Sequence, residues 1–494
     1  MTDYDAIVLG GGAPGEHCAA AIADEGLRVA VVERELLGGT CTYWGCIPSK
    51  TLLRPGEAVA DARAVPGARE AVTGAVDPSA ALAWRDWMVS KYDDSGAVGW
   101  ATDHGIAVIR GEGTLAGPHA VAVGDATYTA RHVVIATGAD AVLPPVAGLR
   151  DLPGLWTNRE VTSLTEIPRR LLILGGGPVG VEMSQALARM GAAVTIVEHG
   201  DHLLPREPKP VGTAVGVALA RDGIDLRLGR SVTAARLDGA EYVLELTDGT
   251  QVRGDRVLVA TGRRPRVEGI GLESVGIAAD PRGVPVDDRM CAGDGLWAVG
   301  DVTGQWQLTH VGEYQARVVA ANIAGRHRRV NYDAVPRVVF CDPQAAAVGA
   351  ATGTYTATVS LADVARTATY TRAYDTQPGF ATLVSDGMRL TGAYAVGPEA
   401  GEWMQQATVA IRTRTPLEVL LDVIQPFPTF SEALLQGLRD LDRQVRARQR
   451  DGSSSRVRQA LTVDPEQFAA GSALVEPCGL LAVEEVHRTN GSSS

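Results

Sequence analysis

Two cysteines, Cys41 and Cys46, are the residues most able to do chemistry, and four residues separate them. Thiols at this spacing can lie about one helical turn apart, close enough to form a disulfide. Pro48 favours the first turn of a helix, which would put Cys46 at a positive helix end that stabilises the reactive thiolate. The alternatives are a structural disulfide and two inert buried thiols. In a reducing compartment a close pair is more typical of catalysis or metal binding.

The composition is that of a soluble globular chain of 494 residues, enough for about three domains. Hydrophobic residues make up 45% and charged residues 21%, and the net charge is −12. An acidic chain has no electrostatic reason to bind nucleic acid or an anionic membrane, so both are excluded as main partners. No apolar run reaches transmembrane length, and a strand-like run at residues 5–9 follows the start directly, without a secretory signal. We therefore expect a reducing cytoplasmic location.

The thiol pair directly follows the first copy of an internal repeat, so we expect that repeat to position it. Two apolar strand-like runs each lead into a Gly-x-Gly-x-x-Gly turn, an Ala-rich helical pattern and a second strand that ends in an acid. In the first copy Glu33 lies 23 residues after the first glycine, and in the second copy Glu198 does. The glycines of the two turns are Gly10, Gly12 and Gly15 in the first, and Gly175, Gly177 and Gly180 in the second.

This pattern is typical of dinucleotide binding. The first glycine allows the tight turn, the second lets a phosphate approach the backbone, and the third lets helix and strand pack closely. The pyrophosphate then lies at the helix N-terminus, and the acid binds the ribose hydroxyls. The alternative is two ordinary glycine-rich loops, but two copies in full context favour two nucleotide sites.

The rest of the chain adds strands ending at residues 134–138, 258–262 and 296–301. After about residue 335 threonine and β-branched residues recur, which predicts antiparallel strands through 354–371. Helical patterns follow at 401–413 and from 431 to about 450. Residues 451–455 resemble a linker, and we expect a loosely attached tail after them.

Residues 3–445 resemble the flavin-dependent pyridine nucleotide–disulfide oxidoreductases, whose members include dihydrolipoamide dehydrogenase, glutathione reductase and mercuric reductase. The resemblance is carried by Cys-x-x-x-x-Cys-x-Pro-Ser-Lys at 41–50 after the first glycine turn. Further matching segments are residues 136–138, 260–265, 299–301, 335–349 and 392–402.

This resemblance implies an α/β fold with two nested Rossmann-like dinucleotide-binding domains and a C-terminal α+β dimerisation domain. Residues 1–148 and 270–333 would bind FAD, 149–269 would bind NAD(P), 334–450 would form the interface domain, and 451–494 the C-terminal tail. It also implies a homodimer, because the family builds each active site from both chains.

The resemblance implies a role for each matching residue. Cys46 would be the thiolate against the flavin, Cys41 the outer thiol that exchanges with substrate, and Lys50 would pair with Glu182 beside the flavin ring. The residues expected to hold FAD are Gly10, Gly12, Gly15, Glu33, Thr40, Lys50, Gly113, Ala136, Gly138, Gly300, Asp301 and Thr309. Those expected at the nicotinamide nucleotide are Gly175, Gly177, Gly180, Glu198 and Gly262. No metal site is expected, since the histidines and the other cysteines lack ligand spacing.

Glu198 bears on the choice of nucleotide. A carboxylate at this strand end accepts hydrogen bonds from free ribose hydroxyls and repels a 2′-phosphate. The sequence therefore predicts NADH over NADPH, although His199, His202 and Arg206 could soften this preference.

One motif departs from the family. Where relatives carry His-Pro-x-x-x-Glu, this chain has Phe427 and Pro428, and Glu432 is retained. The family's histidine is the acid–base partner of the outer thiol, and phenylalanine cannot move a proton. Losing a general acid typically costs about 10²–10⁴-fold in rate, which argues against efficient reduction of an organic disulfide.

Several acceptors remain open. One is a metal ion, which needs no proton at the thiol; mercuric reductases also lack this histidine. A second is a quinone reduced directly by flavin, as in a diaphorase. A third is a chemistry that excludes protons, as in ketopropyl coenzyme M carboxylase, which has Phe here but also replaces the Glu. Alternatively another acid, such as Glu432, replaces the histidine.

We therefore expect an enzyme that passes electrons from NADH through FAD and a Cys41–Cys46 disulfide to a small-molecule acceptor. The non-enzyme alternative is a redox-sensing flavoprotein subunit. Tyr43 and Trp44, inside the cysteine loop, are interpreted as narrowing the pocket, as stacking on a flat acceptor or as core packing. Cys478, a lone cysteine in the tail, is interpreted as incidental or as a thiol shuttle.

Overall fold

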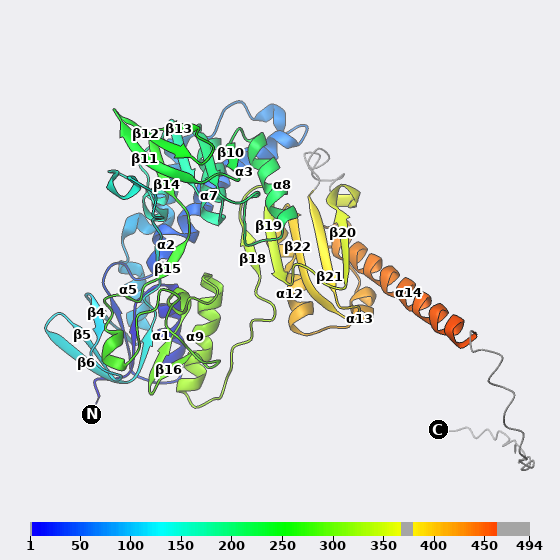
Figure 1. The fold of residues 1–494 in the computed structure, drawn as a ribbon. Coiled ribbons are helices and arrows are strands. Elements are labelled where there is room, and N and C mark those ends of the chain that lie inside the picture. The colour runs from blue at the N-terminus through cyan, green and yellow to red at the C-terminus, as the bar shows by residue number, and fades with distance from the viewer. Residues whose placement is uncertain (1, 367–378, 462–494) are drawn as a thin grey trace, which may run out of the picture. The chain divides into compact units, whose positions relative to one another are not determined.

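The computed structural model describes residues 2–366 and 379–461. The chain divides into two compact units, Met1–Asp442 and Arg443–Ser494. All the sheets of the described chain lie in the first unit (Figure 1). None of its described helices is long and apolar enough to cross a membrane.

The first sheet has eight strands and follows the first glycine repeat. Its strands run in the order β16-β17-β6-β1-β2-β3, and the hairpin of β4 and β5 extends from β6. The central strands are parallel because their Val, Ala and Ile runs are buried on both faces. The strands are β1 (Tyr4–Leu9), β2 (Val29–Glu33), β3 (Ile106–Arg110), β4 (Gly113–Leu115), β5 (Ala120–Val123), β6 (Ala126–Ile135), β16 (Cys291–Gly293) and β17 (Leu296–Ala298).

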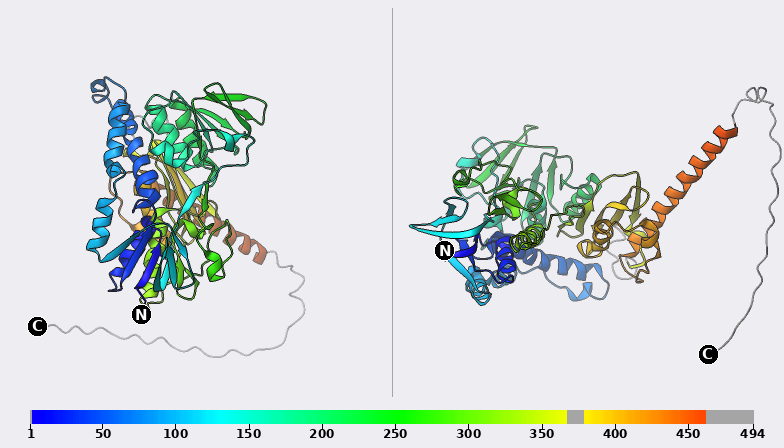
Figure 2. Two further views of the ribbon diagram at one scale, coloured as in Figure 1. Left: turned by 90° about the vertical axis from the view of Figure 1, so that its left-hand side faces the viewer. Right: turned by 90° about the horizontal axis from the view of Figure 1, so that it is seen from below.

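Helices cover this sheet and extend from it. Helix α1 (Ala13–Ala23) packs against α9 (Thr309–Ile323), and both join one apolar core with β1 and β2 (Figure 1). Helices α3 (Cys46–Ala64) and α4 (Pro78–Met88) lie side by side, as the left view of Figure 2 shows in blue. The others here are α2 (Gly39–Trp44), α5 (Ser95–Asp103) and α6 (Asn158–Thr162).

The second repeat forms a parallel sheet in the order β10-β9-β8-β14, with helices α7 (Pro178–Arg189) and α8 (Lys209–Arg221). Its strands are β8 (Arg170–Leu174), β9 (Ala193–Glu198), β10 (Asp225–Leu228) and β14 (Arg256–Val259). A small antiparallel sheet of β11 (Val232–Asp238), β12 (Glu241–Leu246) and β13 (Gln251–Gly254) accompanies it. A two-stranded ribbon of β7 (Ala139–Ala141) and β15 (Arg263–Pro265) links the segments on either side of this part.

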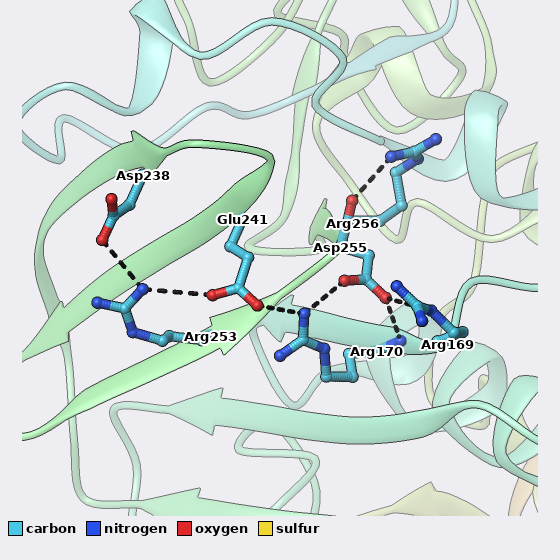
Figure 3. Close-up of polar contacts among 7 residues, drawn as sticks. All are labelled: Arg169, Arg170, Asp238, Glu241, Arg253, Asp255 and Arg256. Atoms are coloured by element: carbon cyan, nitrogen blue, oxygen red, sulfur yellow. Dashed lines mark hydrogen bonds and ion pairs between the residues drawn. The ribbon is translucent and has the colours of Figure 1, made fainter.

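An ion-pair network links the parallel sheet that contains β8 to the small antiparallel sheet of β11, β12 and β13 (Figure 3). Arg170, the first residue of β8, donates to Glu241 at 2.6 Å and to Asp255 at 2.7 Å. Arg253 donates to Asp238 at 3.0 Å and also reaches Glu241. The network lies at the amino end of β8, whereas the glycine turn follows its carboxyl end, so we assign it a structural role.

The C-terminal sheet is antiparallel, and its order is β18-β19-β22-β21-β20. Its strand β20 lies within residues 354–371, where the threonine-rich pattern predicts antiparallel strands, and residues 367–378 lie outside the described chain. Its strands are β18 (Arg337–Val339), β19 (Gln344–Gly349), β20 (Tyr355–Ser360), β21 (Phe380–Ser385) and β22 (Leu390–Gly397). Helices α11 (Ala400–Trp403), α12 (Gln405–Arg412) and α13 (Leu417–Asp422) follow, and then α14 (Glu432–Leu461) begins.

One expectation about the C-terminal region was wrong. The helical pattern predicted at 401–413 is present as α11 and α12, but α14 continues through residues 451–455, where a linker was expected. A serine or glycine in a growing helix costs less than about 1 kcal/mol, so an established helix can propagate through such a stretch. The rest of the expected tail, including Cys478, lies outside the described residues.

Candidate functional site

The two glycine turns adopt the same local structure. Gly10 has a φ of 107° and Gly175 a φ of 105°, a backbone conformation that favours glycine. A Cβ on Gly15 would collide with the carbonyl oxygen of Gly10, and one on Gly180 would collide with that of Gly175. Each third glycine therefore allows the helix to pack closely on its turn.

The acids of the two repeats also play matching local roles. Glu33 accepts a 2.7 Å hydrogen bond from the backbone N–H of Gly11, and Glu198 accepts one of 2.6 Å from Gly176. Both carboxylates are buried at the ends of their strands. The Nδ1 of the exposed His199 lies 2.7 Å from Glu198 Oε1, so His199 adjoins the acid expected to select the nucleotide.

A large cleft opens beside the first glycine turn. Its empty volume is ≈ 1250 Å³, a figure that includes the open solvent at its mouth. Ten of the residues expected to hold FAD line it, together with both cysteines of the loop. These ten are Gly10, Gly12, Glu33, Thr40, Gly113, Ala136, Gly138, Gly300, Asp301 and Thr309.

Two residues expected at FAD have other positions. Gly15 packs against the turn, and Lys50 lies one helical turn beyond Cys46, where it pairs with Glu182. A cradle of glycine backbone fits a dinucleotide: a Cβ on Gly39 would collide with the Cα of Gly12, where the backbone must stay open to a phosphate. The donors and shape of the cleft therefore fit FAD.

Helix starts position both sulfurs. Cys41 lies in α2, and Cys46 is the first residue of α3, with Pro48 in its first turn as the sequence predicts. The Thr309 hydroxyl, at the start of α9, donates to Cys41 Sγ at 3.1 Å and lies 3.7 Å from Cys46 Sγ. The two sulfurs thus meet one hydroxyl group, with the positive ends of α3 and α9 close by.

The two thiols differ in acidity because they share a proton. A hydrogen bond from Cys41 and the positive charge of Lys50 lower the pKa of Cys46 to about 6 against the effect of burial. The same hydrogen bond and burial raise the pKa of Cys41 far above its usual range, and hydrogen bonds with the Thr309 hydroxyl and the Cys46 backbone oppose this rise. These opposite shifts favour the thiolate at Cys46 over the thiolate at Cys41.

Lys50 and Glu182 meet as the resemblance implies. Lys50 Nζ donates to Glu182 Oε2 at 2.7 Å, and Glu182 Oε1 accepts from the backbone N–H of Phe340 at 3.0 Å. The ammonium also lies 4.7 Å from the centre of the Phe340 ring. Phe340, which the sequence analysis did not single out, thus holds both members of the pair. Phe340 lies in the matching segment at 335–349, but its contacts come from elements far apart in the chain and are not visible in that segment alone.

Asp301 is one of the residues that line the cleft. Burial raises its pKa, and Arg263 opposes this effect with a 2.6 Å ion pair. Arg34, Arg159 and Arg266 also line the cleft, and none of the three was predicted there from the sequence. Arg263 directly follows Gly262, so the matching segment at 260–265 offered a signal for it, whereas Arg266 lies just beyond that segment.

The residues inside the cysteine loop have separate roles. Tyr43 is buried and belongs to the core. Trp44 lines the cleft, and the Arg159 guanidinium lies 3.7 Å from the centre of its ring. Trp44 therefore narrows the cleft, whereas Tyr43 packs.

Phe427 and Glu432 lie in another part of the chain. Phe427 is 75% exposed, and Glu432 accepts a weak hydrogen bond from the N–H of Thr429. In the described residues of this one chain, neither lines the cleft that holds the cysteines. Phe430, three residues after Phe427, is 2% exposed and packs near Trp403 in the core of the C-terminal sheet.

Comparisons with known proteins agree with this arrangement. The family profile described as pyridine nucleotide-disulphide oxidoreductase matches residues 4–316, and the profile of its dimerisation domain matches 335–437. Dihydrolipoyl dehydrogenase of Thermus scotoductus is 33% identical over 90% of this chain and 99% of its own. Mercuric reductase of Streptomyces lividans is 35% identical over 88% of this chain and 95% of its own.

A solved structure gives the same result in three dimensions. The Cu(II) complex of the HOCl-induced flavoprotein disulfide reductase RclA from Escherichia coli superposes with a TM-score of 0.78 at 27% identity. The match covers 89% of this chain and 99% of that one. The fold class predicted from the two repeats and the C-terminal sheet is confirmed.

The two family profiles thus cover the paired glycine turns, the two neighbouring thiols and the C-terminal sheet. FAD and a nicotinamide nucleotide are the cofactors typical of proteins built in this way. The chain belongs to the pyridine nucleotide-disulphide oxidoreductase family and carries the dimerisation domain of that family.

Proposed function

We propose that this enzyme passes electrons from NADH, through FAD and the Cys41–Cys46 pair, to a thiol-binding metal ion. The observation that carries the proposal is Phe427, which stands where a disulfide reductase needs a proton donor and is 75% exposed. Mercuric reductases among the relatives and the Cu(II) complex of RclA support the same class of acceptor.

Proton balance explains why a metal ion suits this site. Reducing an organic disulfide with NADH takes up one proton and needs an acid to protonate the leaving thiolate. Reducing a divalent ion by two electrons, or two such ions by one electron each, instead releases one proton per NADH. An apolar Phe427 side chain is therefore a defect for the first reaction and is tolerated in the second.

The chain's own residues have defined parts in this scheme. Bound FAD would supply hydride acceptance from NADH and transfer of an electron pair to the disulfide. Cys46, held at the start of α3 and near Lys50, keeps the charge of the reduced pair. Cys41 carries the proton and must lose it before both sulfurs can bind an ion. Soft divalent ions bind thiolates rather than thiols.

The finer parts of the proposal concern nucleotide and assembly. Glu198, buried and acidic at the end of β9, favours NADH over NADPH. We place Phe427 at a homodimer interface, because Ile424 and Val423 beside it are 94% and 46% exposed apolar residues. Light scattering on the purified protein would give a mass of one chain if the homodimer is wrong.

The test compares acceptors under one set of conditions. NADH oxidation is measured with Hg(II), Cu(II), lipoamide and benzoquinone in weakly buffered solution, while pH is recorded. We expect the highest kcat/KM with a metal ion, one proton released per NADH, and loss of that activity in Cys41→Ser. Faster lipoamide reduction with proton uptake would overturn the proposal. So would metal-dependent turnover that survives in Cys41→Ser, which would favour direct reduction by flavin.

A further inference from the structure

The acids of the two repeats are held by the backbone in the same way. Each accepts a hydrogen bond from its glycine turn and a second one from the N–H two residues further along the chain. This second bond is 2.7 Å long at Glu33 and 2.7 Å long at Glu198. Any difference between the two sites therefore comes from the side chains around the acids.

The residue directly after each acid distinguishes the repeats. In the first repeat it is Arg34, whose guanidinium donates to Glu112 at 3.0 Å. In the second it is His199, whose Nδ1 lies 2.7 Å from Glu198 Oε1. The His199 side chain is 76% exposed and can exchange protons with solvent, whereas that of Glu198 is 4% exposed. Of the two repeats, the second thus places a titratable base against its acid.

The other charged groups of the segment after β9 are directed elsewhere. Asp201 pairs with Lys209, and His202 Nδ1 lies 2.7 Å from the carbonyl oxygen of Leu203. Arg206 is exposed. An arginine keeps its charge over the whole working range of pH, so any attraction of Arg206 for a phosphate does not change with pH.

Strand β10 and the segment after it add two arginines, and each has an acid of its own. Arg227 donates to Asp225 at 2.9 Å, and Arg230 donates to Asp248 at 2.6 Å. The backbone N–H of Arg230 bonds the carbonyl oxygen of Glu198 at 3.1 Å, so this segment lies beside the acid. In the described chain, the basic side chain within ion-pair distance of the Glu198 carboxylate is that of the next residue, 199.

Charge at this point affects how a 2′-phosphate is received. The Glu198 carboxylate accepts hydrogen bonds from the free ribose hydroxyls of NADH and repels the 2′-phosphate of NADPH. Histidine gains a proton as pH falls from about 8 to about 5. An imidazolium 2.7 Å from the carboxylate offsets its negative charge, so the repulsion of a 2′-phosphate falls.

We propose that His199 is a specificity-determining residue of the nicotinamide nucleotide site. As a neutral imidazole it leaves the preference for NADH to Glu198, and as an imidazolium it admits NADPH as well, so NADPH is used increasingly as pH falls. This inference rests on the proposed binding of NADH beside Glu198, but it does not depend on the acceptor. The only chemical change in the switch is the transfer of one proton from solvent to the His199 ring.

The experiment follows the reduction of bound FAD, which needs no acceptor. The oxidised holoenzyme is mixed anaerobically with NADH or NADPH between about pH 5.5 and about pH 8.5, and the loss of flavin absorbance gives a second-order rate constant for each nucleotide. The ratio of the two constants, NADPH over NADH, cancels the pH effects that both reactions share, including those of the thiols. We expect this ratio to rise about tenfold from the alkaline to the acid end.

Two variants hold the charge at position 199 constant. His199→Gln is neutral at every pH and should keep the ratio low, apart from the change due to the 2′-phosphate itself, which binds its second proton near a pKa of about 6. His199→Arg is always charged and should keep the ratio high. The parent should move from the first level to the second as pH falls. His327→Gln, an exposed histidine between α9 and β18, is the matched control and should follow the parent.

The inference is overturned if the ratio in the parent follows that of His199→Gln over the whole pH range, because the change then belongs to the 2′-phosphate or to another group such as His202. Equal ratios in His199→Arg and His199→Gln would also overturn it. FAD content is measured for every variant, so that a change caused by lost flavin is recognised.

Glu198→Gln separates this failure from a failure of the proposed function. It removes the carboxylate and should raise the ratio at alkaline pH. If Glu198→Gln responds and the His199 variants do not, the role of His199 is wrong and the nucleotide assignment stands. If Glu198→Gln leaves the ratio unchanged, the proposed binding of NADH beside Glu198 is itself wrong, and the role of His199 falls with it.

Discussion

Lys50 and Glu182 are 132 residues apart in the chain, and their side chains meet in a 2.7 Å ion pair next to the thiol centre. The pair joins α3 to α7. The backbone N–H of Phe340, directly after strand β18 of the C-terminal sheet, donates to the same Glu182 carboxylate. Segments from all three parts of the fold therefore converge on one charge pair. This pair contributes to the electrostatics of Cys46, because Lys50 and Glu182 act on its thiolate in opposite directions.

Substitutions in this pair should shift the thiol in opposite directions. Lys50→Met removes the cation and should raise the pKa of Cys46, whereas Glu182→Gln removes the anion and should lower it, each by about one unit. The pH dependence of the thiolate-to-flavin absorption band in the reduced enzyme measures both. The double variant serves as control and should lie between the single ones. Shifts of the same sign in both single variants would contradict this view of the site.

Thiolate-dependent turnover should depend on pH through Cys46. Its pKa is lowered to about 6, so the thiolate is present above that pH and is lost as pH falls through it. The largest cause is the hydrogen bond from Cys41. Cys41→Ala should therefore move the midpoint of the absorption band upward by about one unit, while Cys41→Ser keeps a donor and should move it less. Equal midpoints in the two variants would show that the hydrogen bond is unimportant.

Restoring the missing acid should restore disulfide chemistry. Phe427→His is expected to raise kcat/KM for lipoamide, by up to about 10²–10⁴-fold, because a general acid then reaches the leaving thiolate. Ile424→His places the same group on a 94% exposed residue nearby and should have no such effect. Adding Glu432→Gln to Phe427→His should remove most of the gain, since the carboxylate orients the imidazole. No gain in Phe427→His would mean that proton transfer is not what limits lipoamide reduction.

The matching acids of the two repeats provide a paired test of cofactor assignment. Glu198→Gln should lower the ratio of kcat/KM for NADH over NADPH, by about tenfold, and leave FAD bound. Glu33→Gln, at the same position of the first repeat, should weaken FAD binding and leave that ratio unchanged. Steady-state kinetics with both nucleotides and fluorescence of released flavin measure the two effects. If Glu198→Gln weakened FAD binding and Glu33→Gln changed the NADH/NADPH ratio, the assignment of FAD to the first repeat and of the nicotinamide nucleotide to the second would be wrong.

The sequence by itself determined the parts of this protein that depend on neighbours in the chain. Each glycine turn needs the positive φ seen at Gly10 and Gly175, and the buried strands before them are continuous apolar runs, so the nucleotide folds follow from local pattern. Likewise Pro48 after Cys46 predicts the helix start that favours a thiolate. These features are local because backbone conformation and burial of a strand are encoded in short segments.

Tertiary packing decided the rest. Only the fold brings the Thr309 hydroxyl to both sulfurs and the Phe340 N–H to Glu182, because these contacts join segments more than 150 residues apart. Phe427 and Phe430 are three residues apart and of one type, yet one is exposed and the other fills a core. Residue type sets a preference for burial, but which of two such side chains is buried depends on the surface that the neighbouring elements present, and that surface exists only after the chain has folded.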